Sequence, residues 1–236
     1  HELNNKSGIM RALTIFFLSL FSLPLVLNAQ SVDEMLQKVS AAIESGQHGQ
    51  AVSYFRQTIG LNIDRTEMFY WTSIDKSSEI SSKLAVELAS AYRRNRNYDK
   101  AYLFYKELLQ KTPDNVDYLE ACAEMQVCRG QEKEALRMYE KVLQLDADNL
   151  AANIFLGNYY YLMAEKEKKR LDTDFKKLAS PTKMQYARYR DGLSKVFSTG
   201  YQKARNSLRK VISQFPSTEA QKTLDKILRI EKEVNR

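Results

Sequence analysis

Two stretches of the chain repeat one another at a spacing of 34 residues, and this periodicity restricts the fold more than any other feature of the sequence. The stretch NYDKAYLFYKELLQKTPDN aligns without gaps with QEKEALRMYEKVLQLDADN, so that Ala101 matches Ala135 and Asn115 matches Asn149. A repeat of this length is typical of arrays in which one supersecondary unit stacks on copies of itself. One unit cannot cover its own apolar face, so the copies must share a continuous core.

The repeated unit is predicted to be helical. The 236 residues include only 8 Gly and 4 Pro, which fits long helices better than a loop-rich β fold. Small residues such as Ala101 and Ala135 suit places where two helices cross closely, and the rings of Tyr105 and Tyr139 suit the gaps beside them. The sequence therefore predicts an all-α solenoid.

The pattern resembles the tetratricopeptide repeat (TPR) family, whose motif is W-x2-L-G-x2-Y, then A-x3-F, then P, across two antiparallel helices. The resemblance implies about three helical-hairpin repeats, with copies at about 32–65, 82–115 and 116–149 and a further, split copy. The first copy is predicted to open with a capping box at Ser31-x-x-Glu34. The matching residues of the second and third copies are Leu88, Ala89, Tyr92, Ala101, Tyr105, Pro113, Ala123, Gly130, Ala135 and Tyr139.

The copy that starts at residue 150 is interrupted. Lys169, inside a charged run, stands where the paired small residue of the second helix should fall. The second half of the pattern resumes about 35 residues later, so 165–199 is predicted to be an insertion that leaves and re-enters one repeat. The split repeat is predicted at 150–164 plus 200–218, with Leu156, Gly157, Tyr160, Ala204 and Pro216 in register.

The insertion is predicted to be a helical hairpin. Its outgoing arm extends the first helix to about residue 178, and a turn follows with Ser180 as N-cap and Pro181 at the first helical position. The returning arm is predicted to end at Thr199-Gly200. Apolar spacings of three and four predict a seam between the arms. The seam residues are Ala164, Leu171, Phe175 and Leu178 on the outgoing arm and Tyr186, Tyr189, Leu193 and Val196 on the returning arm.

A rival interpretation makes 185–218 a complete repeat, with Gly192 in the Gly position of the motif. Charged residues would then occupy positions that should be apolar, so we prefer the split repeat.

A second insertion is predicted at 66–81, as a short helix opened by a capping box at Asp64-x-x-Glu67. Its aromatic residues are expected to cover the core, and residues 217–235 are predicted to form a terminal capping helix.

The first 29 residues are expected to lie outside the folded domain. From Met10, a positive Arg11 and an apolar run lead to Leu27-Asn-Ala29, which resembles a signal-peptide cleavage site. The residues before Met10 are interpreted as an upstream extension or a mis-set start. We expect a single TPR-like domain over 30–236, exported to the periplasm or cell envelope. No Cys follows the apolar run, so a lipoprotein is not expected.

The charge of the chain is concentrated in the inserted hairpin. Without residues 1–29 the chain keeps 34 basic and 28 acidic residues, and residues 161–200 contribute ten basic and five acidic ones. This basic arm could contact anionic lipid, a glycan or an acidic partner, whereas export argues against nucleic acid. The residues expected to carry that role are Lys168, Lys169, Arg170, Lys176, Lys177, Lys183, Arg188 and Arg190.

No catalytic signature is present, so we expect neither an enzyme nor a cofactor or metal site. His48 is the only His after residue 29, and neither a nucleophile–base arrangement nor a phosphate loop nor zinc spacing accompanies it. Cys122 and Cys128 lie six residues apart, a rise of ~9 Å on one helix, which is too far for a disulfide. We expect two packed residues, with an intermolecular disulfide as the alternative.

The TPR resemblance implies a protein or peptide partner, because the first helices of TPR hairpins line a concave groove. The sequence does not indicate the oligomeric state. By this resemblance the groove would be lined by Lys83, Arg93, Arg94, Asp117, Glu120, Glu124, Ile154, Asn158 and Tyr161.

Overall fold

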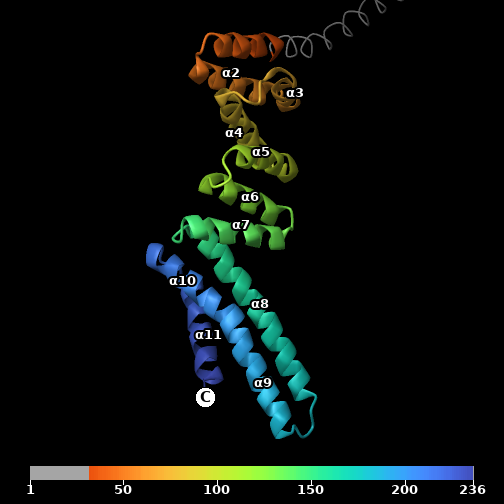
Figure 1. The fold of residues 1–236 in the computed structure, drawn as a ribbon, viewed down its shortest axis with the longest axis vertical. Coiled ribbons are helices and arrows are strands. Elements are labelled where there is room, and N and C mark those ends of the chain that lie inside the picture. Colours follow the sequence, from red (N-terminus) through yellow and green to blue (C-terminus); the bar gives the residue numbers. More distant parts are fainter. Residues whose placement is uncertain (1–31, 236) are drawn as a thin grey trace, which may run out of the picture. The chain divides into compact units, whose positions relative to one another are not determined.

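The structure is a computed structural model that describes residues 32–235, and every regular element within that range is a helix (Figure 1). This confirms the all-α prediction. The predicted signal peptide and the capping box at Ser31 lie outside the described residues. The chain divides into two compact units, here called unit 1 (residues 32–108) and unit 2 (residues 109–235). The single domain over 30–236 stays a prediction.

Unit 1 contains the first two predicted hairpins and one additional helix. The turn of the first hairpin passes through Gly46, whose φ of 72° favours glycine. Ala51 and Phe55 of that hairpin are fully buried, as are Ala89 and Ala101 of the next. The helices are residues 32–44, α2 (His48–Leu61), α3 (Ile63–Ser73), α4 (Glu79–Arg94) and α5 (Tyr98–Lys111), which ends just beyond the division.

The additional helix, α3, begins earlier than predicted. Its N-cap is Asn62, whose side chain accepts a hydrogen bond from the Arg65 backbone N–H at 2.9 Å, so the predicted capping box at Asp64 is wrong. Tyr70 is the fully buried aromatic residue of this helix, edge-on to Phe104 at 5.6 Å. Trp71 stacks on the same ring but stays partly exposed, so it covers the core only at its margin.

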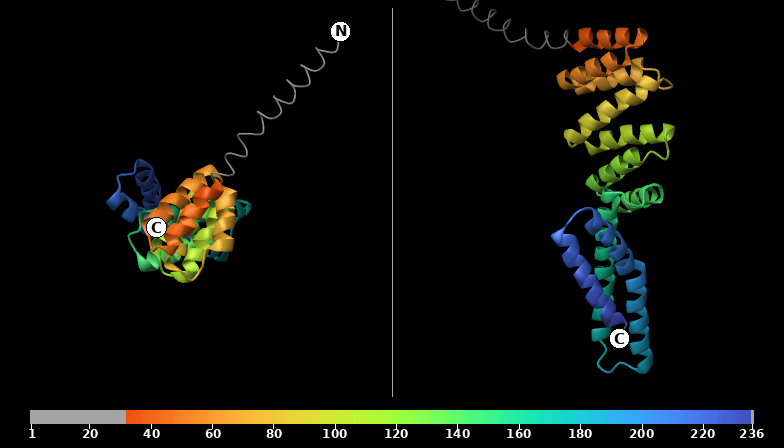
Figure 2. Two further views of the ribbon diagram at one scale, coloured as in Figure 1. Left: turned by 90° about the horizontal axis from the view of Figure 1, so that it is seen from above. Right: turned by 90° about the vertical axis from the view of Figure 1, so that its left-hand side faces the viewer.

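Unit 2 contains the next hairpin, the split repeat and the terminal helix (Figure 2). Asn115 and Asn149, which the sequence matches at 34 residues, both cap helices, because their side chains accept from Tyr118 N–H and Ala152 N–H. The elements are α6 (Val116–Cys128), α7 (Glu132–Leu145), α8 (Leu150–Lys176), α9 (Lys183–Val196), the π-helical segment η1 (Phe197–Tyr201), α10 (Gln202–Gln214) and α11 (Thr218–Val234).

One ion pair recurs across the insertion. Lys141 of α7 contacts Asp114 at 2.9 Å and also donates to the Pro113 carbonyl. Lys210 of α10 makes the same two contacts one repeat later, with Asp148 at 3.2 Å and with the carbonyl of residue 147. Helix α10 therefore takes the place beside α8 that α7 takes beside α6. This is the pairing that the split-repeat interpretation requires.

The returning arm corrects two predictions. Its N-cap is Thr182, which forms a capping box with Gln185, rather than Ser180 with Pro181 in the helix. The arm also does not end at Thr199-Gly200, because the backbone stays helical through η1 into α10. Without a turn between α9 and α10, residues 185–218 do not form a hairpin of their own. The rival repeat is therefore wrong.

The two arms pair along the predicted seam, and α8 and α9 run side by side in Figures 1 and 2. Phe175 stacks on Tyr189 with ring centroids 4.2 Å apart. Asp172 accepts hydrogen bonds from Tyr189 at 2.6 Å and Lys168 at 2.8 Å. Burial, together with the bond to Asp172, raises the pKa of Tyr189 to about 12. Helix α11 closes the unit, and Arg205 of α10 pairs with its Glu231 at 2.5 Å.

Candidate functional site

A cleft of about 520 Å³ lies in unit 2 between α8, α10 and α11, and we call it the α8–α11 cleft. It lies between α8, the first helix of the split repeat, and the terminal helix α11, and α10 contributes lining residues between them. The lining residues that matter most are Ile154 and Asn158 of α8, Leu208 and Val211 of α10, Phe215 at the end of α10, and Lys222 and Lys226 of α11.

The floor of the cleft is apolar and tightly packed. Leu208 and Val211 are buried. A Cβ atom added to Gly157 would lie 3.0 Å from Leu208 Cδ2, so the absence of a side chain at Gly157 lets α10 approach α8 closely. The floor is therefore formed by packed helices rather than by a loop, which gives a ligand a fixed surface.

Two large apolar side chains beside this floor are exposed to solvent. Phe215 is the C-cap of α10, where the backbone is extended (φ −142°, ψ 121°), and Pro216 then prevents the helix from continuing. The Phe215 side chain leaves the helical path and is 60% exposed, while Ile154 is 43% exposed. Exposed apolar side chains gathered at a concave apolar surface mark an interaction site.

The rim of the cleft carries a small positive charge. Lys222 and Lys226 lie one turn apart on α11, and Glu219 is the acidic residue in the lining. Within the described part of the chain, neither lysine has a carboxylate within salt-bridge distance. Asn158, on α8, adds a neutral amide to the same rim.

The predicted groove residues of unit 2 are only partly brought together. Ile154 and Asn158 line the cleft, whereas Tyr161 is half-buried with its ring 6.1 Å from that of Tyr201. Burial and the nearby Glu165 raise the pKa of Tyr161. The other three lie on α6: Asp117 is exposed, Glu120 accepts from the Asn149 amide at 2.9 Å, and Glu124 is half-buried.

The predicted groove residues of unit 1 are charged residues of α4. Lys83 pairs with Glu79 at 2.8 Å one turn away, and Arg93 and Arg94 are exposed in the last turn. Their role stays a prediction.

The basic arm is partly neutralised by its own carboxylates. Arg170 pairs with Glu167 at 2.6 Å and with Asp174 at 3.4 Å. Lys168 pairs with Asp172 and Lys177 with Asp174, Arg188 contacts Met184 Sδ, and Arg190 donates to the Val234 carbonyl. In the described residues, Lys169, Lys176 and Lys183 have no such ion pair.

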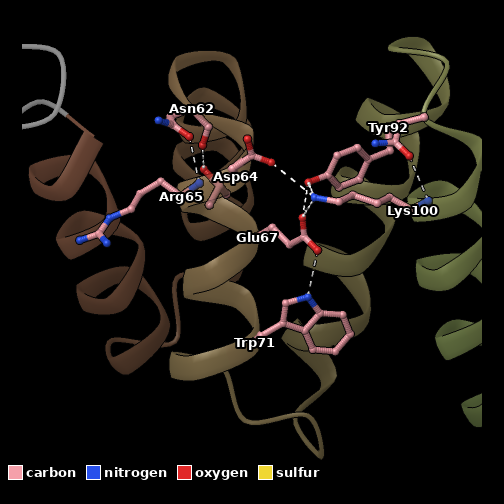
Figure 3. Close-up of polar contacts among 9 residues, drawn as sticks. Asn62, Asp64, Arg65, Glu67, Trp71, Tyr92 and Lys100 are labelled. Atoms are coloured by element: carbon pink, nitrogen blue, oxygen red, sulfur yellow. Dashed lines mark hydrogen bonds and ion pairs between the residues drawn. The ribbon is translucent and has the colours of Figure 1, made fainter. Parts of the chain in front are cut away.

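A cluster of polar side chains in unit 1 is also a candidate, but its groups satisfy one another (Figure 3). Glu67 of α3 accepts hydrogen bonds from Lys100 at 2.7 Å, from the Tyr92 hydroxyl, and from Trp71 Nε1 at 3.3 Å. Burial alone would raise the pKa of Glu67, but these three donors outweigh it and the pKa is lowered. Burial and Glu67 also raise the pKa of Tyr92 to about 12. The cluster holds α3, α4 and α5 together, so we assign it a structural role.

Metal ligands, membrane-spanning helices and cysteine pairing were the remaining features to consider in residues 32–235. No group of three or more His, Cys, Asp or Glu side chains there is arranged to hold a metal ion. No helix of residues 32–235 is long and apolar enough to cross a membrane. Cys122 is buried, Cys128 is exposed, and neither is in a disulfide.

Comparison with known proteins gives a family match and a close structural relative. The tetratricopeptide repeat model matches residues 84–116. A crystal structure from Bacteroides ovatus, provisionally named a protein-binding protein, is 85% identical, covers 86% of this chain and 98% of its own, and has a TM-score of 0.77. A tetratricopeptide repeat protein from Parabacteroides merdae is 16% identical, covers 86% of this chain and 74% of its own, and has a TM-score of 0.38. No curated protein matches the chain. The chain belongs to the tetratricopeptide repeat family.

Proposed function

We propose that the protein is a non-catalytic interaction module that binds a segment of a partner protein in the α8–α11 cleft. The observation that carries this proposal is Phe215, a large aromatic side chain that is 60% exposed above a buried apolar floor. Aromatic anchors that enter or form an apolar pocket dominate the free energy of many protein interfaces. The TPR fold and the name of the Bacteroides ovatus relative support the same class of function.

The cleft also indicates what part of a partner it would hold. Its volume suits one or two apolar side chains rather than a folded domain. Lys222 and Lys226 on the rim favour a segment whose neighbouring residues are acidic or carry polar acceptors. The charged residues of α6 predicted for the groove, Asp117, Glu120 and Glu124, would extend this surface within unit 2.

We also propose that the module works in the periplasm or cell envelope. The support is the signal peptide predicted from residues 1–29. Cell fractionation with an antibody against the folded chain tests this part separately: envelope or periplasmic fractions are expected, and retention in the cytoplasm would contradict it.

The alternative function, contact of the basic arm with anionic lipid or glycan, has weaker support. Arg170, Lys168 and Lys177 are held by carboxylates of the same arm, which lowers the charge available to a polyanion. We therefore prefer the cleft as the main interaction site.

A photo-crosslinking amino acid at position 215 tests the cleft directly in living cells. Position 184 is the matched control, because Met184 is also exposed but lies on α9, outside the cleft. We expect a discrete crosslinked protein from position 215 that is absent from position 184 and is lost when Ile154→Lys is added. Equal products from both positions, or persistence in the Ile154→Lys variant, would refute the proposed site.

A further inference from the structure

A second cleft, of about 420 Å³, lies on the inserted hairpin where α8 meets η1, and we call it the arm cleft. Its walls come from α8, the last residue of α9 and the π-helical segment. Segments of π-helix within longer helices frequently accompany functional sites, because they widen the helix and displace its side chains. Its lining includes Met163, Lys166, Glu167, Arg170, Val196 and Gly200.

The arm cleft is separate from the α8–α11 cleft. Met163 follows Asn158 by five residues, which at ~100° per residue is roughly 140° around α8. The two clefts therefore open on different faces of the same helix. A ligand in the arm cleft would therefore bind independently of a partner in the α8–α11 cleft.

The length of α8 explains why this surface is open. Helix α7 contacts α8 through the Tyr139 and Phe155 rings, 4.7 Å apart, and through the Tyr160 hydroxyl, which donates to Glu140 at 2.5 Å. These contacts lie in the first half of α8, and the arm cleft begins at Met163 in the next turn. The insertion extends α8 past the end of α7. The face of α8 that α7 covers in its first half is therefore uncovered by α7 further along the helix.

The surface inside the arm cleft is mainly apolar. Val196 and Ala164 form a buried base, and Gly200 packs against Ala164 without a side chain. Met163 stands at the edge and is 42% exposed. A methionine side chain is flexible and polarisable, so it adapts to apolar ligands of different shapes.

The charges around the cleft leave one positive group unmatched. Arg170 is held by Glu167 at 2.6 Å and by Asp174 at 3.4 Å. Lys166 also lines the cleft, and among residues 32–235 no carboxylate lies within salt-bridge distance of it. An apolar hollow beside one uncompensated ammonium group is complementary to an apolar molecule with a single negative charge.

We propose that the arm cleft binds a small apolar monoanion, specifically a free carboxylate on an alkyl chain. Its volume falls within the range of ~300–1,000 Å³ that small-molecule sites occupy, and such sites combine an apolar lining with a few polar groups. The alkyl chain lies against Met163, Ala164 and Val196, and the carboxylate accepts hydrogen bonds from the Lys166 ammonium group. No bond is made or broken.

The test is a titration of the isotope-labelled protein with octanoate, followed by backbone amide chemical shifts. Saturable shifts are expected at residues 163–170 and 196–200 of the arm cleft. Lys166→Glu and Met163→Glu are expected to weaken octanoate binding at least tenfold. The matched controls Lys176→Glu and Met184→Glu lie on the same arm outside the cleft, and we expect them to stay within twofold of wild type.

Three results would overturn the proposal. Shifts that do not saturate, or that are not confined to the arm cleft, would show that it is not a site for this ligand. Equal binding of octyltrimethylammonium would show that the negative charge is not recognised. Unchanged affinity in a folded Lys166→Glu variant would show that Lys166 is not the partner. Because the variants lie away from Phe215, crosslinking from position 215 should persist in all of them.

Discussion

A Cβ atom added to Gly200 would stand 2.6 Å from the Cβ atom of Ala164, because η1 brings the returning arm against the backbone of α8. The same Cβ would lie 3.3 Å from the Ala164 Cα and from the Tyr160 carbonyl oxygen. These are backbone atoms of a packed helix, so they cannot rotate out of the way. This contact is the point where the inserted hairpin rejoins its repeat.

Gly200→Ala is therefore expected to destabilise unit 2 by roughly 1–3 kcal/mol, despite the better helix propensity of Ala. Urea unfolding followed by circular dichroism measures the change. The control is Gly192→Ala, where the added Cβ would meet only the end of the Leu171 side chain, at 3.1 Å. That side chain can move, so a smaller loss is expected. Equal losses in the two variants would argue against the close approach at Gly200.

Ala101→Glu is expected to destabilise unit 1 by roughly 3 kcal/mol or more. Ala101 is fully buried in α5, and a carboxylate placed there would be desolvated at a site with no room for it. Leu103→Glu is the control, because Leu103 is on the same helix but exposed. Thermal unfolding checks both variants. A wild-type melting temperature for Ala101→Glu would disprove the repeat register.

Glu67→Gln is expected to lower stability in a way that depends on pH. The pKa of Glu67 is lowered in the folded protein, because donors that include Lys100 and Tyr92 outweigh its burial. A carboxylate with a lowered pKa stabilises the fold above its unfolded pKa, and this contribution is lost as the pH falls through the folded pKa. The difference in melting temperature between wild type and variant should be largest near neutral pH. It should shrink as the pH drops below ~4.

If the melting temperatures of wild type and Glu67→Gln differed as much at pH 3 as at pH 7, the ionised Glu67 carboxylate would not be the source of the stability. Asp33→Asn is a suitable control, because the ion pair of Asp33 with Arg65 is exposed and contributes little to stability.

Phe175→Ala is expected to loosen the tip of the inserted hairpin without unfolding the repeats. The ring stacks on Tyr189 at 4.2 Å and lies edge-on to Tyr186 at 6.0 Å, far along α8 from its contacts with α7. Hydrogen exchange by mass spectrometry should show faster exchange over residues 170–190 and unchanged exchange in α6 and α7. Equally faster exchange in all of these helices would show that the arm does not open on its own.

The sequence predicts the repeats because their packing is local and periodic. Ala101, Ala135 and Ala204 lie at close helix crossings and are all fully buried. The ion pairs Lys141–Asp114 and Lys210–Asp148 are related by the same period once the insertion of about 35 residues is taken out, and they could also have been used to place α10. Where each helix crossing depends on one small or charged residue, the spacing of those residues in the sequence is enough to predict the repeat.

The helix ends were predicted less well, because several residues compete for the same local role. Asn62 and Asp64 could both cap α3, and the structure uses Asn62. Thr199-Gly200 resembles a helix stop, but packing of Gly200 on Ala164 keeps that segment helical. Tertiary contacts of this kind override a local signal and are invisible in the spacing of residues.

The cleft was predicted only in part for a similar reason. Ile154 and Asn158 were predicted from the TPR resemblance, which places the first helix of each hairpin at the groove, and they share one face of α8. Phe215 joins them from the end of α10, and Lys222 and Lys226 join them only because α11 folds back against α10. The one local signal was Phe215 directly before Pro216 at a helix end, where a large aromatic side chain cannot continue the buried stripe.

The most direct test of the central claim is the dissociation constant of the partner protein captured from position 215. Phe215→Ala should weaken binding at least ~10-fold, which corresponds to ~1.4 kcal/mol and is typical of an aromatic anchor. Met184→Ala, outside the cleft, should stay within about twofold of wild type. An unchanged dissociation constant in a folded Phe215→Ala variant would contradict the assignment of the α8–α11 cleft as the binding site.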